Sequence, residues 1–208
     1  MKNFQRLFLL LVVAMVALVG CSEFGKSPVD DIITVKDGQF IRNGEPYYFV
    51  GTNFWYGAIL GSEGEGGNRE RLVRELDFMK SHGIDNLRVL VGGEGENGLL
   101  GKIEPNLQPE PGLYNDDVLA GLDFLMMELG KRGMTAVLYF NNAWEWSGGY
   151  TQYVAWANNT PVLVPRVDGW FSYNAFAGEF VRNERAKELF FNHLRYIITR
   201  TNRYTGLK

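Results

Sequence analysis

The sequence predicts an α/β fold in which a parallel sheet is covered by helices. Amphipathic helical patterns alternate with short strands that are almost continuously apolar, and each helical pattern ends at a glycine. The loops after the strands are long and aromatic, at residues 52–67, 91–115 and 141–183, whereas the loops before the strands are short. Closed barrels and open doubly wound sheets both build their sites after the strands, so this pattern leaves the two architectures open.

The composition is that of one domain with a sizeable core. The chain has 208 residues, of which 46% are hydrophobic and 14% aromatic. Its formal net charge of −3 provides no basic footprint for nucleic acid, so we expect no nucleic-acid partner. The many aromatic rings suit either a rich core or a surface that binds flat ligands such as sugars.

Residues 1–21 are predicted to be a lipoprotein signal peptide. Lys2 and Arg6 precede the apolar run 7–20, which is too short for a comfortable membrane span and fits a signal core. The run ends in Leu18-Val19-Gly20-Cys21, which resembles a bacterial lipobox with Cys21 as the lipidated residue. The alternative is an uncleaved hydrophobic anchor.

Lipidation of Cys21 predicts an exported protein. The chain is then anchored to the bacterial cell envelope, at the outer membrane or the surface, or else secreted, and the membrane is a partner through the lipid. Cys21 is the only cysteine, so neither a disulfide nor a catalytic thiol remains. We expect residues 22–31 to form a tether and residues 32–208 to hold the fold.

The fold is predicted to begin with a β-hairpin. Residues 32–35 and 39–41 flank Lys36-Asp37-Gly38, and an Asp-Gly pair is a strong hairpin-turn signal. A second turn at 43–46 leads to Tyr47-Tyr48-Phe49-Val50-Gly51, which we predict to be the first buried strand.

Helix and strand then alternate. Asn68 is suited to cap a helix that stops at Gly83, and the strand 84–90 follows. The apolar residues of that helix share one face: Leu72, Val73, Leu76 and Met79.

Two further helices are predicted by the same spacing. Asp116 or its neighbour opens one that stops at Gly133, before the strand 134–140. The other carries apolar residues from Ala186 to Ile198, with Gly206 just past its end.

The segment 93–98 matches the G-x-G-x-x-G pattern, but we expect no dinucleotide there. The residues after Gly98 do not have a helical pattern, and a helix must begin there to meet a pyrophosphate. Glu94 and Glu96 also repel a dianion. No cofactor is therefore predicted.

No metal site is predicted either. His82 ends a helix and His193 falls on an apolar helix face, so both are expected to be structural. Two isolated histidines and one lipidated cysteine do not form a ligand set.

Arg88 is the unusual residue of the second strand. A guanidinium among Leu87, Val89 and Leu90 has to be solvated or paired, and its natural partner is a carboxylate at the strand ends. A purely structural salt bridge is the alternative.

The stretch LYFNNAWEWSGG, residues 138–149, carries the binding prediction. Asn141 and Asn142 offer amides to hydroxyl groups, and Trp144 and Trp146 offer ring faces. Gly148-Gly149 allows the backbone to turn sharply beneath a ligand. Amides, rings and close backbone together suit a carbohydrate, although Trp146 also suits the core.

These segments resemble one family as a series. Residues 50–56, VGTNFWY, and 86–89, NLRV, look like the first two strands of family 5 glycoside hydrolases. Residues 141–149, with Tyr153 and Trp156, look like the third strand and loop of the endo-β-1,4-mannanases in that family. Residues 183–189 and 200–206 resemble the helix that follows. The resemblance covers about residues 32–208.

The resemblance implies a (β/α)8 TIM barrel, of which about the first three βα units are present, and a retaining two-Glu hydrolysis of mannan, glucomannan or galactomannan. It puts Arg88 where an arginine holds the nucleophile, and Trp55 and Trp144 at sugar subsites. The acid/base and nucleophile Glu are expected beyond Lys208, so the chain alone is expected to be inactive. Asn183-Glu184 opens a helix and is not assigned the acid role.

Three alternatives stay open from the sequence. One is a non-catalytic surface lipoprotein that grips glycans with Trp55, Trp144 and Trp146. Another is a β-1,4-glucanase of the same family, because cellulose-active relatives share the barrel. The third is a cell-envelope scaffold in which all these aromatic rings belong to the core.

Overall fold

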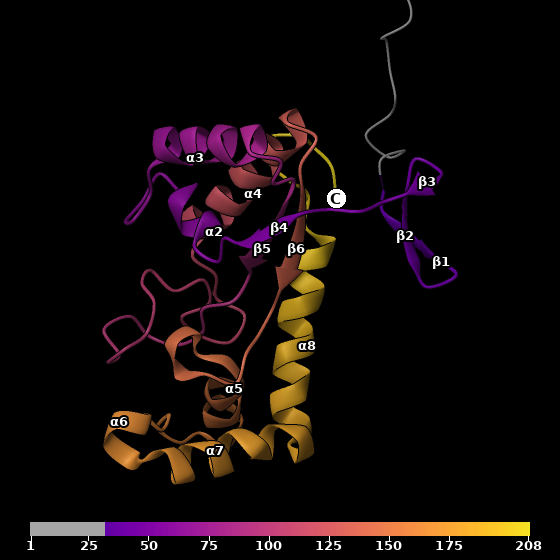
Figure 1. Cartoon of the computed structure of the whole chain (residues 1–208). Helices are drawn as coiled ribbons and strands as arrows, with labels where there is room; N and C mark the ends of the chain where they lie inside the picture. The colour runs from indigo at the N-terminus through magenta and orange to yellow at the C-terminus, as the bar shows by residue number, and fades with distance from the viewer. Residues whose placement is uncertain (1–31) are drawn as a thin grey trace, which may run out of the picture. The chain divides into compact units, whose positions relative to one another are not determined.

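The computed structural model describes residues 32–208 (Figure 1). The predictions for the signal peptide, the lipobox and the tether fall on residues 1–31 and lie outside the described residues. The described chain divides between residues 48 and 49 into two compact units. From residue 32 onward, no helix has both the length and the apolar content to cross a bilayer.

The first unit is the predicted hairpin extended by a third short strand. β1 (Thr34–Lys36), β2 (Gln39–Arg42) and β3 (Glu45–Pro46) form an antiparallel sheet in that order. Both residues of the Asp37-Gly38 and Asn43-Gly44 turns have positive φ, between 52° and 84°. Two consecutive positive φ angles define the type I′ turn that matches strand twist, which confirms the turn prediction.

The second unit contains the predicted parallel sheet. β4 (Gly51–Asn53), β5 (Asn86–Leu90) and β6 (Thr135–Tyr139) pair in the order β4-β5-β6. The register puts Arg88 between Asn53 and Val137. The carboxyl ends of the strands therefore lie along one edge of the sheet.

The prediction that residues 47–51 form the first buried strand is wrong. β4 begins only at Gly51, and Tyr48 is 77% exposed, with Phe49 and Val50 also exposed. Pairing with β5 starts at Gly51, and just upstream the Val50 backbone bonds to Asp85 and Asn86. An apolar run indicates that a segment can form a strand. It does not indicate at which residue the neighbouring strand begins, and that residue sets where pairing starts.

Three longer helices follow the predicted spacing. They are α3 (Arg69–Ser81), α4 (Asp116–Lys131) and α8 (Glu184–Thr199). Asparagines cap all three, with the side chains of Asn68, Asn115 and Asn183 accepting from backbone N–H groups of the first turn. The cap of α4 is thus Asn115, one residue before the predicted opening. Gly83 and Gly133 follow α3 and α4 with positive φ, as predicted for helix stops.

The core lies between these helices and one face of the sheet. Leu72 and Leu76 of α3, Leu87 and Val89 of β5, and Leu125 of α4 are fully buried in one cluster. Alternate residues of a strand face opposite sides, so Arg88 faces away from this core.

A short helix, α2 (Gly57–Leu60), packs against α4 at backbone distance. A Cβ on Gly121 would lie 2.0 Å from the Ala58 carbonyl oxygen, so only glycine fits there. This contact holds α2, which begins two residues after Trp55, against α4.

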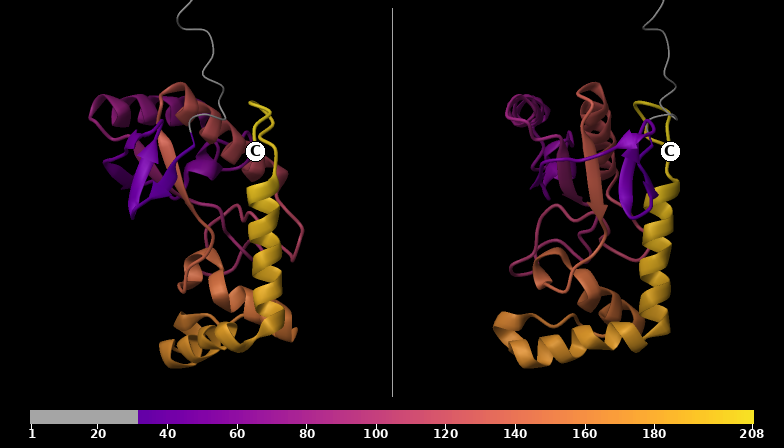
Figure 2. Two further views of the ribbon diagram at one scale, coloured as in Figure 1. Left: turned by 90° about the vertical axis from the view of Figure 1, so that its right-hand side faces the viewer. Right: turned by 45° about the vertical axis from the view of Figure 1, so that its right-hand side comes forward.

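The predicted loop 141–183 is largely helical. It contains η2 (Glu145–Ser147), α5 (Gly149–Asn158), α6 (Pro165–Asp168), α7 (Trp170–Gly178) and η3 (Glu179–Arg182). Figures 1 and 2 show α5, α6 and α7 beyond the carboxyl ends of β5 and β6, with α3 and α4 toward the other end. These helices are short, and their aromatic residues fall on several faces, so no single apolar stripe marks them in the sequence.

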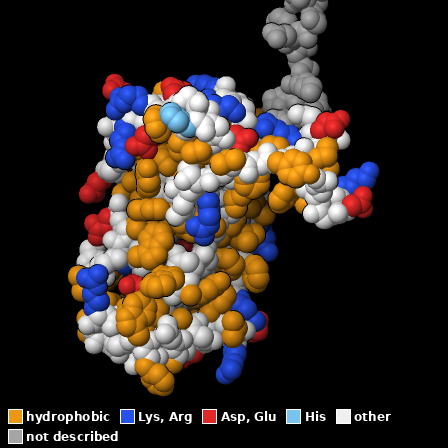
Figure 3. Space-filling view, viewed as in Figure 1, with side chains coloured by type: hydrophobic (Ala, Val, Ile, Leu, Met, Phe, Trp, Pro, Cys, Tyr) orange, Lys and Arg blue, Asp and Glu red, His pale blue; other side chains and the backbone are white. Residues whose placement is uncertain are grey.

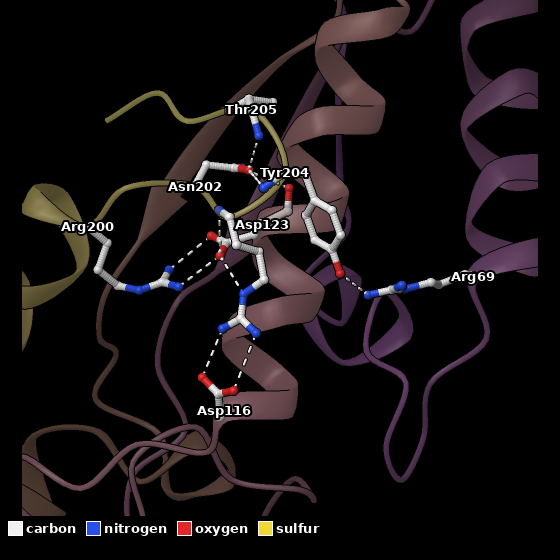
Figure 4. Close-up of polar contacts among 8 residues, drawn as sticks. Arg69, Asp116, Asp123, Arg200, Asn202, Tyr204 and Thr205 are labelled. Carbon is white, nitrogen blue, oxygen red and sulfur yellow. Dashed lines mark hydrogen bonds and ion pairs between the residues drawn. The ribbon is translucent and has the colours of Figure 1, made fainter.

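The residues after α8 are fastened to α4 by two carboxylates, of which Asp123 is the buried one (Figure 4). Asp123 receives both Nη atoms of Arg200 at 2.9–3.0 Å and Nε of Arg203 at 3.2 Å. Asn202 donates to the Asp123 backbone oxygen at 2.8 Å. The Asp123 side chain is only 5% exposed, so its charge depends on these partners.

We expect Asp123→Ala to lower the free energy of unfolding by about 3 kcal/mol, because it leaves two guanidinium groups facing a desolvated position without their carboxylate. Urea denaturation measures the change. Asp116→Ala is the matched control, since Asp116 also pairs with Arg203 at 2.8 Å but its side chain is 79% exposed. The exposed pair should contribute far less. Equal losses in the two variants would contradict the assignment.

Candidate functional site

Arg88 projects from the centre of β5 onto the exposed face of the sheet. Its Nη1 donates to Asn53 Oδ1 at 3.3 Å, and its guanidinium carbon lies 3.5 Å from the centre of the Tyr139 ring. From residue 32 to 208, no carboxylate lies within ion-pair distance of it. The cation is therefore held by an amide and an aromatic face, and the salt bridge expected from the sequence is not formed within this part of the chain.

Trp55 and Trp146 meet although they follow different strands. Their rings are 5.3 Å apart with planes at 68°, and Trp55 also packs edge-on against Tyr56 at 5.5 Å. Both tryptophans are partly exposed. The loops after β4 and β6 thus contribute one indole each to a shared aromatic pair.

The two asparagines after β6 shape their own loop. Asn142 Oδ1 accepts from Trp144 N at 2.7 Å, and Asn142 Nδ2 donates to Ser147 Oγ. Asn141 Oδ1 accepts from Asn142 N at 2.7 Å, while its Nδ2 is buried and has no partner within residues 32–208. Asn142 therefore holds Trp144 in place, and Asn141 keeps one free donor. Contact of either amide with a sugar stays a prediction.

Gly148 and Gly149 have positive φ, at 83° and 64°, and allow a close approach of two loops. A Cβ on Gly148 would lie 2.3 Å from the Glu94 carbonyl oxygen, and one on Gly149 would lie 2.3 Å from that of Asn142. The glycine pair is thus needed for contact with neighbouring backbone.

Trp144 is the most exposed tryptophan of this region, at 60%. Its ring meets that of Trp170, the first residue of α7, at 5.7 Å with planes at 75°. No ring or polar contact in the described chain joins Arg88 to Trp55, Trp144 or Trp146. Two of the predicted tryptophans, Trp55 and Trp146, therefore pair with each other. Trp144 pairs with Trp170, which the sequence did not single out, and Arg88 has separate partners.

Glu94 is a residue of this region that sequence reasoning did not select. It lies in the loop after β5 and is 1% exposed. Its carboxylate accepts from Gly149 N at 3.0 Å and from the hydroxyl of the buried Tyr153 at 3.1 Å. It thus fastens the loop after β5 to the start of α5. The G-x-G-x-x-G pattern around it was the available signal, because flanking glycines permit such a close approach.

Burial dominates the charge state of Glu94. It raises the pKa of this carboxyl from 4.5 to about 7, although the hydrogen bonds from Gly149 and Tyr153 act in the opposite direction. Burial also lowers the pKa of nearby Lys102 to about 8. Lys102 Nζ donates to Gln152 Oε1 at 2.6 Å and to the Glu94 backbone oxygen at 3.3 Å.

The two histidines both contact neighbouring protein groups. His193 is buried, with Nε2 2.7 Å from the Val91 backbone oxygen, and burial lowers its pKa to about 4. The His82 ring packs against that of Phe78 at the end of α3, with the two planes tilted by 35°. After Gly98 the chain forms turns rather than a helix, so the N-terminus that a pyrophosphate needs is lacking there.

Comparison with known proteins gives one consistent result. A family model described as GH family 5 beta-mannosidase-like matches residues 30–208. Mannan endo-1,4-beta-mannosidase 7 of Arabidopsis thaliana is 28% identical over 92% of this chain and 41% of that protein. Mannan endo-1,4-beta-mannosidase 1 of Solanum lycopersicum is 30% identical over 83% of this chain and 39% of that protein.

Solved structures agree with the family match. The family 5 mannosidase from Rhizomucor miehei has a TM-score of 0.81 and 34% identity over 86% of this chain and 46% of that one. A mutant of that enzyme, in complex with mannosyl-fructose, has a TM-score of 0.79. These neighbours are TIM barrels, so the three parallel strands and their helices are part of such a barrel, as the resemblance implied. The chain spans about two fifths of the length of the curated relatives it matches.

We expect Glu94→Gln to remove a pH dependence of stability. Because the folded pKa of about 7 lies above the unfolded one, the stability that Glu94 contributes is full below pH 4.5 and is lost as the pH rises to about 7. At about 1.4 kcal/mol per pKa unit, the wild type should lose roughly 2.5 kcal/mol more than the variant between pH 5 and pH 8.

Urea denaturation at both pH values measures this difference. Glu96→Gln is the control, because Glu96 lies two residues away and is exposed. It should keep the wild-type dependence, whereas parallel pH profiles for wild type and Glu94→Gln would count against a buried, neutral Glu94.

Proposed function

Because the chain belongs to the β-mannosidase-like group of glycoside hydrolase family 5, we propose that the protein acts in the hydrolysis of internal β-1,4-mannosidic bonds in mannans. The observation that carries this proposal is the family match over residues 30–208, together with exposed tryptophans in the loops at the carboxyl edge of the sheet. Mannan, glucomannan and galactomannan share the proposed β-1,4-linked backbone.

We propose that Trp55, Trp144 and Trp146 contact the sugar rings. Their indoles are exposed or partly exposed, and two of them come from different strand-end loops that meet. Asn141 is proposed to donate its unpaired Nδ2 to a sugar hydroxyl. Asn142 is proposed to act from the same loop, chiefly by holding the Trp144 backbone.

Arg88 is proposed to hold the nucleophilic carboxylate of a retaining mechanism. Such a mechanism needs two carboxyl groups roughly 5–5.5 Å apart. The loop acids of the described chain suit this poorly: Glu94 is buried and bound to Gly149 and Tyr153, and Glu96 is exposed. The support for Arg88 is its exposed position beside an amide and a ring, with a cation that can take a carboxylate from another strand.

A non-catalytic glycan-binding role is the second candidate. The observation that favours it is that the described chain presents aromatic faces at the sheet edge but commits the best-placed carboxylate, Glu94, to loop packing. This role predicts that the protein binds the glycan but does not hydrolyse it. A β-1,4-glucanase is the third, and it predicts a preference for cellulose over mannan.

We also propose that the protein is exported and attached to the cell envelope through a lipid on Cys21. The support is the sequence Leu18-Val19-Gly20-Cys21 after an apolar run. Cys21→Ser should abolish incorporation of radiolabelled palmitate in a bacterial host and move the protein from the membrane fraction to the soluble one. Labelling that survives the substitution would contradict the proposal.

We expect mannan in a native gel to retard the purified chain, and Trp144→Ala to reduce that retardation without changing the unfolding temperature, because the exposed indole contributes contact area and little core packing. Phe78→Ala on α3 removes an equally exposed ring outside the site and should migrate like the wild type. Gels with cellulose derivatives test the glucanase alternative.

The same protein should release no reducing sugar from mannan. Release would overturn the proposal that the catalytic carboxylates come from outside the described chain. Absence of retardation for the wild type would count against the binding surface itself.

A further inference from the structure

Trp170 is an exposed aromatic residue that packing does not require. It begins α7, is 48% exposed and lies outside both buried hydrophobic clusters of the described chain. Yet it has two ring partners: Trp144 at 5.7 Å and Tyr173 at 5.7 Å, both close to perpendicular. An indole that is ordered by its neighbours but open to solvent has the features of a ligand contact.

One buried side chain holds this pair together. Tyr173 is fully buried, its hydroxyl donates to the Ala143 backbone oxygen at 3.2 Å, and it lies 3.2 Å from Thr151 Oγ1. The residue after Ala143 is Trp144, and Tyr173 lies one helical turn after Trp170. The same tyrosine therefore links the loop that carries Trp144 to the helix that carries Trp170, so neither indole has to be ordered by a ligand at binding.

The location of the pair relates it to the proposed site. Figure 1 shows α6 and α7 beyond the carboxyl ends of the strands, and the face in Figure 3 carries hydrophobic side chains from the sheet down to that region. Trp144 and Trp146 are two residues apart, yet one pairs with Trp170 and the other with Trp55. The loop after β6 thus carries two tryptophans that have different aromatic partners.

We propose that Trp170 contacts the substrate and forms, with Trp144, an outer subsite for one mannose unit of a β-1,4-mannan chain. The inference rests on the proposed function. Two ring planes at 75° make a corner instead of a flat platform, so one pyranose is contacted on two sides. Both indoles are exposed, so a sugar can reach the corner from solvent.

Neighbouring residues provide the contrast that makes the inference testable. Phe171 follows Trp170 on α7 and is 90% exposed, but it has no ring contact among residues 32–208. In nonspecific apolar binding, Trp170 and Phe171 would both contribute to affinity. In the proposed subsite, only Trp170 contributes. Phe171→Ala is therefore a matched control for Trp170→Ala.

The experiment is calorimetric titration of the purified chain with mannohexaose. Trp170→Ala should weaken binding about threefold to tenfold, which is the size of one aromatic contact. Trp170→Phe should retain most of the affinity, and Phe171→Ala should equal the wild type. Unfolding temperatures within error of each other establish that the variants fold.

The outcomes separate the two levels of the proposal. If the wild type does not bind mannohexaose, the proposed function fails and takes the subsite with it. If the wild type binds but Trp170→Ala binds equally well, or Phe171→Ala loses as much, the outer subsite is wrong and the proposed function stands.

Discussion

The buried carboxyl of Glu94 is the contact on which the strand-end region depends. It joins the loop after β5 to the first turn of α5 through Gly149 and Tyr153, at a point where glycines bring two backbones together. A carboxyl in such a place is costly to ionise, so its stability contribution depends on a proton. The positions of Trp144 and Trp146, just before Gly149, follow from this packing.

The tryptophans beyond the carboxyl ends of the strands form two pairs, Trp55 with Trp146 and Trp144 with Trp170. Among the described residues, no ring or polar contact joins Arg88 to the three tryptophans predicted to bind sugar. Arg88 lies on the sheet face beside Tyr139, whereas the indoles are paired across loops and helices. The two aromatic pairs and the arginine are thus distinct sets of contacts in this region.

Periodicity predicted the longer elements well. The faces of α3, α4 and α8 and the apolar strands β5 and β6 follow from spacing, and the Asp37-Gly38 turn from its chemistry. The limits of the first strand depend on a partner strand, which no local pattern reports. The helices of residues 145–182 are short and lack a single apolar stripe. Glu94 looked like a loop acid because its burial comes from contacts with Gly149 and Tyr153, more than fifty residues away.

The glycine at position 121 sets how closely α2 approaches α4. Its backbone touches that of Ala58 with no room for a methyl group, and α2 begins two residues after Trp55. Trp55 lines a small cavity together with residues of both helices, so a side chain at position 121 would move α2 and change the surroundings of the Trp55 indole. A substitution between two helices would in this way reach an indole that is proposed to bind sugar.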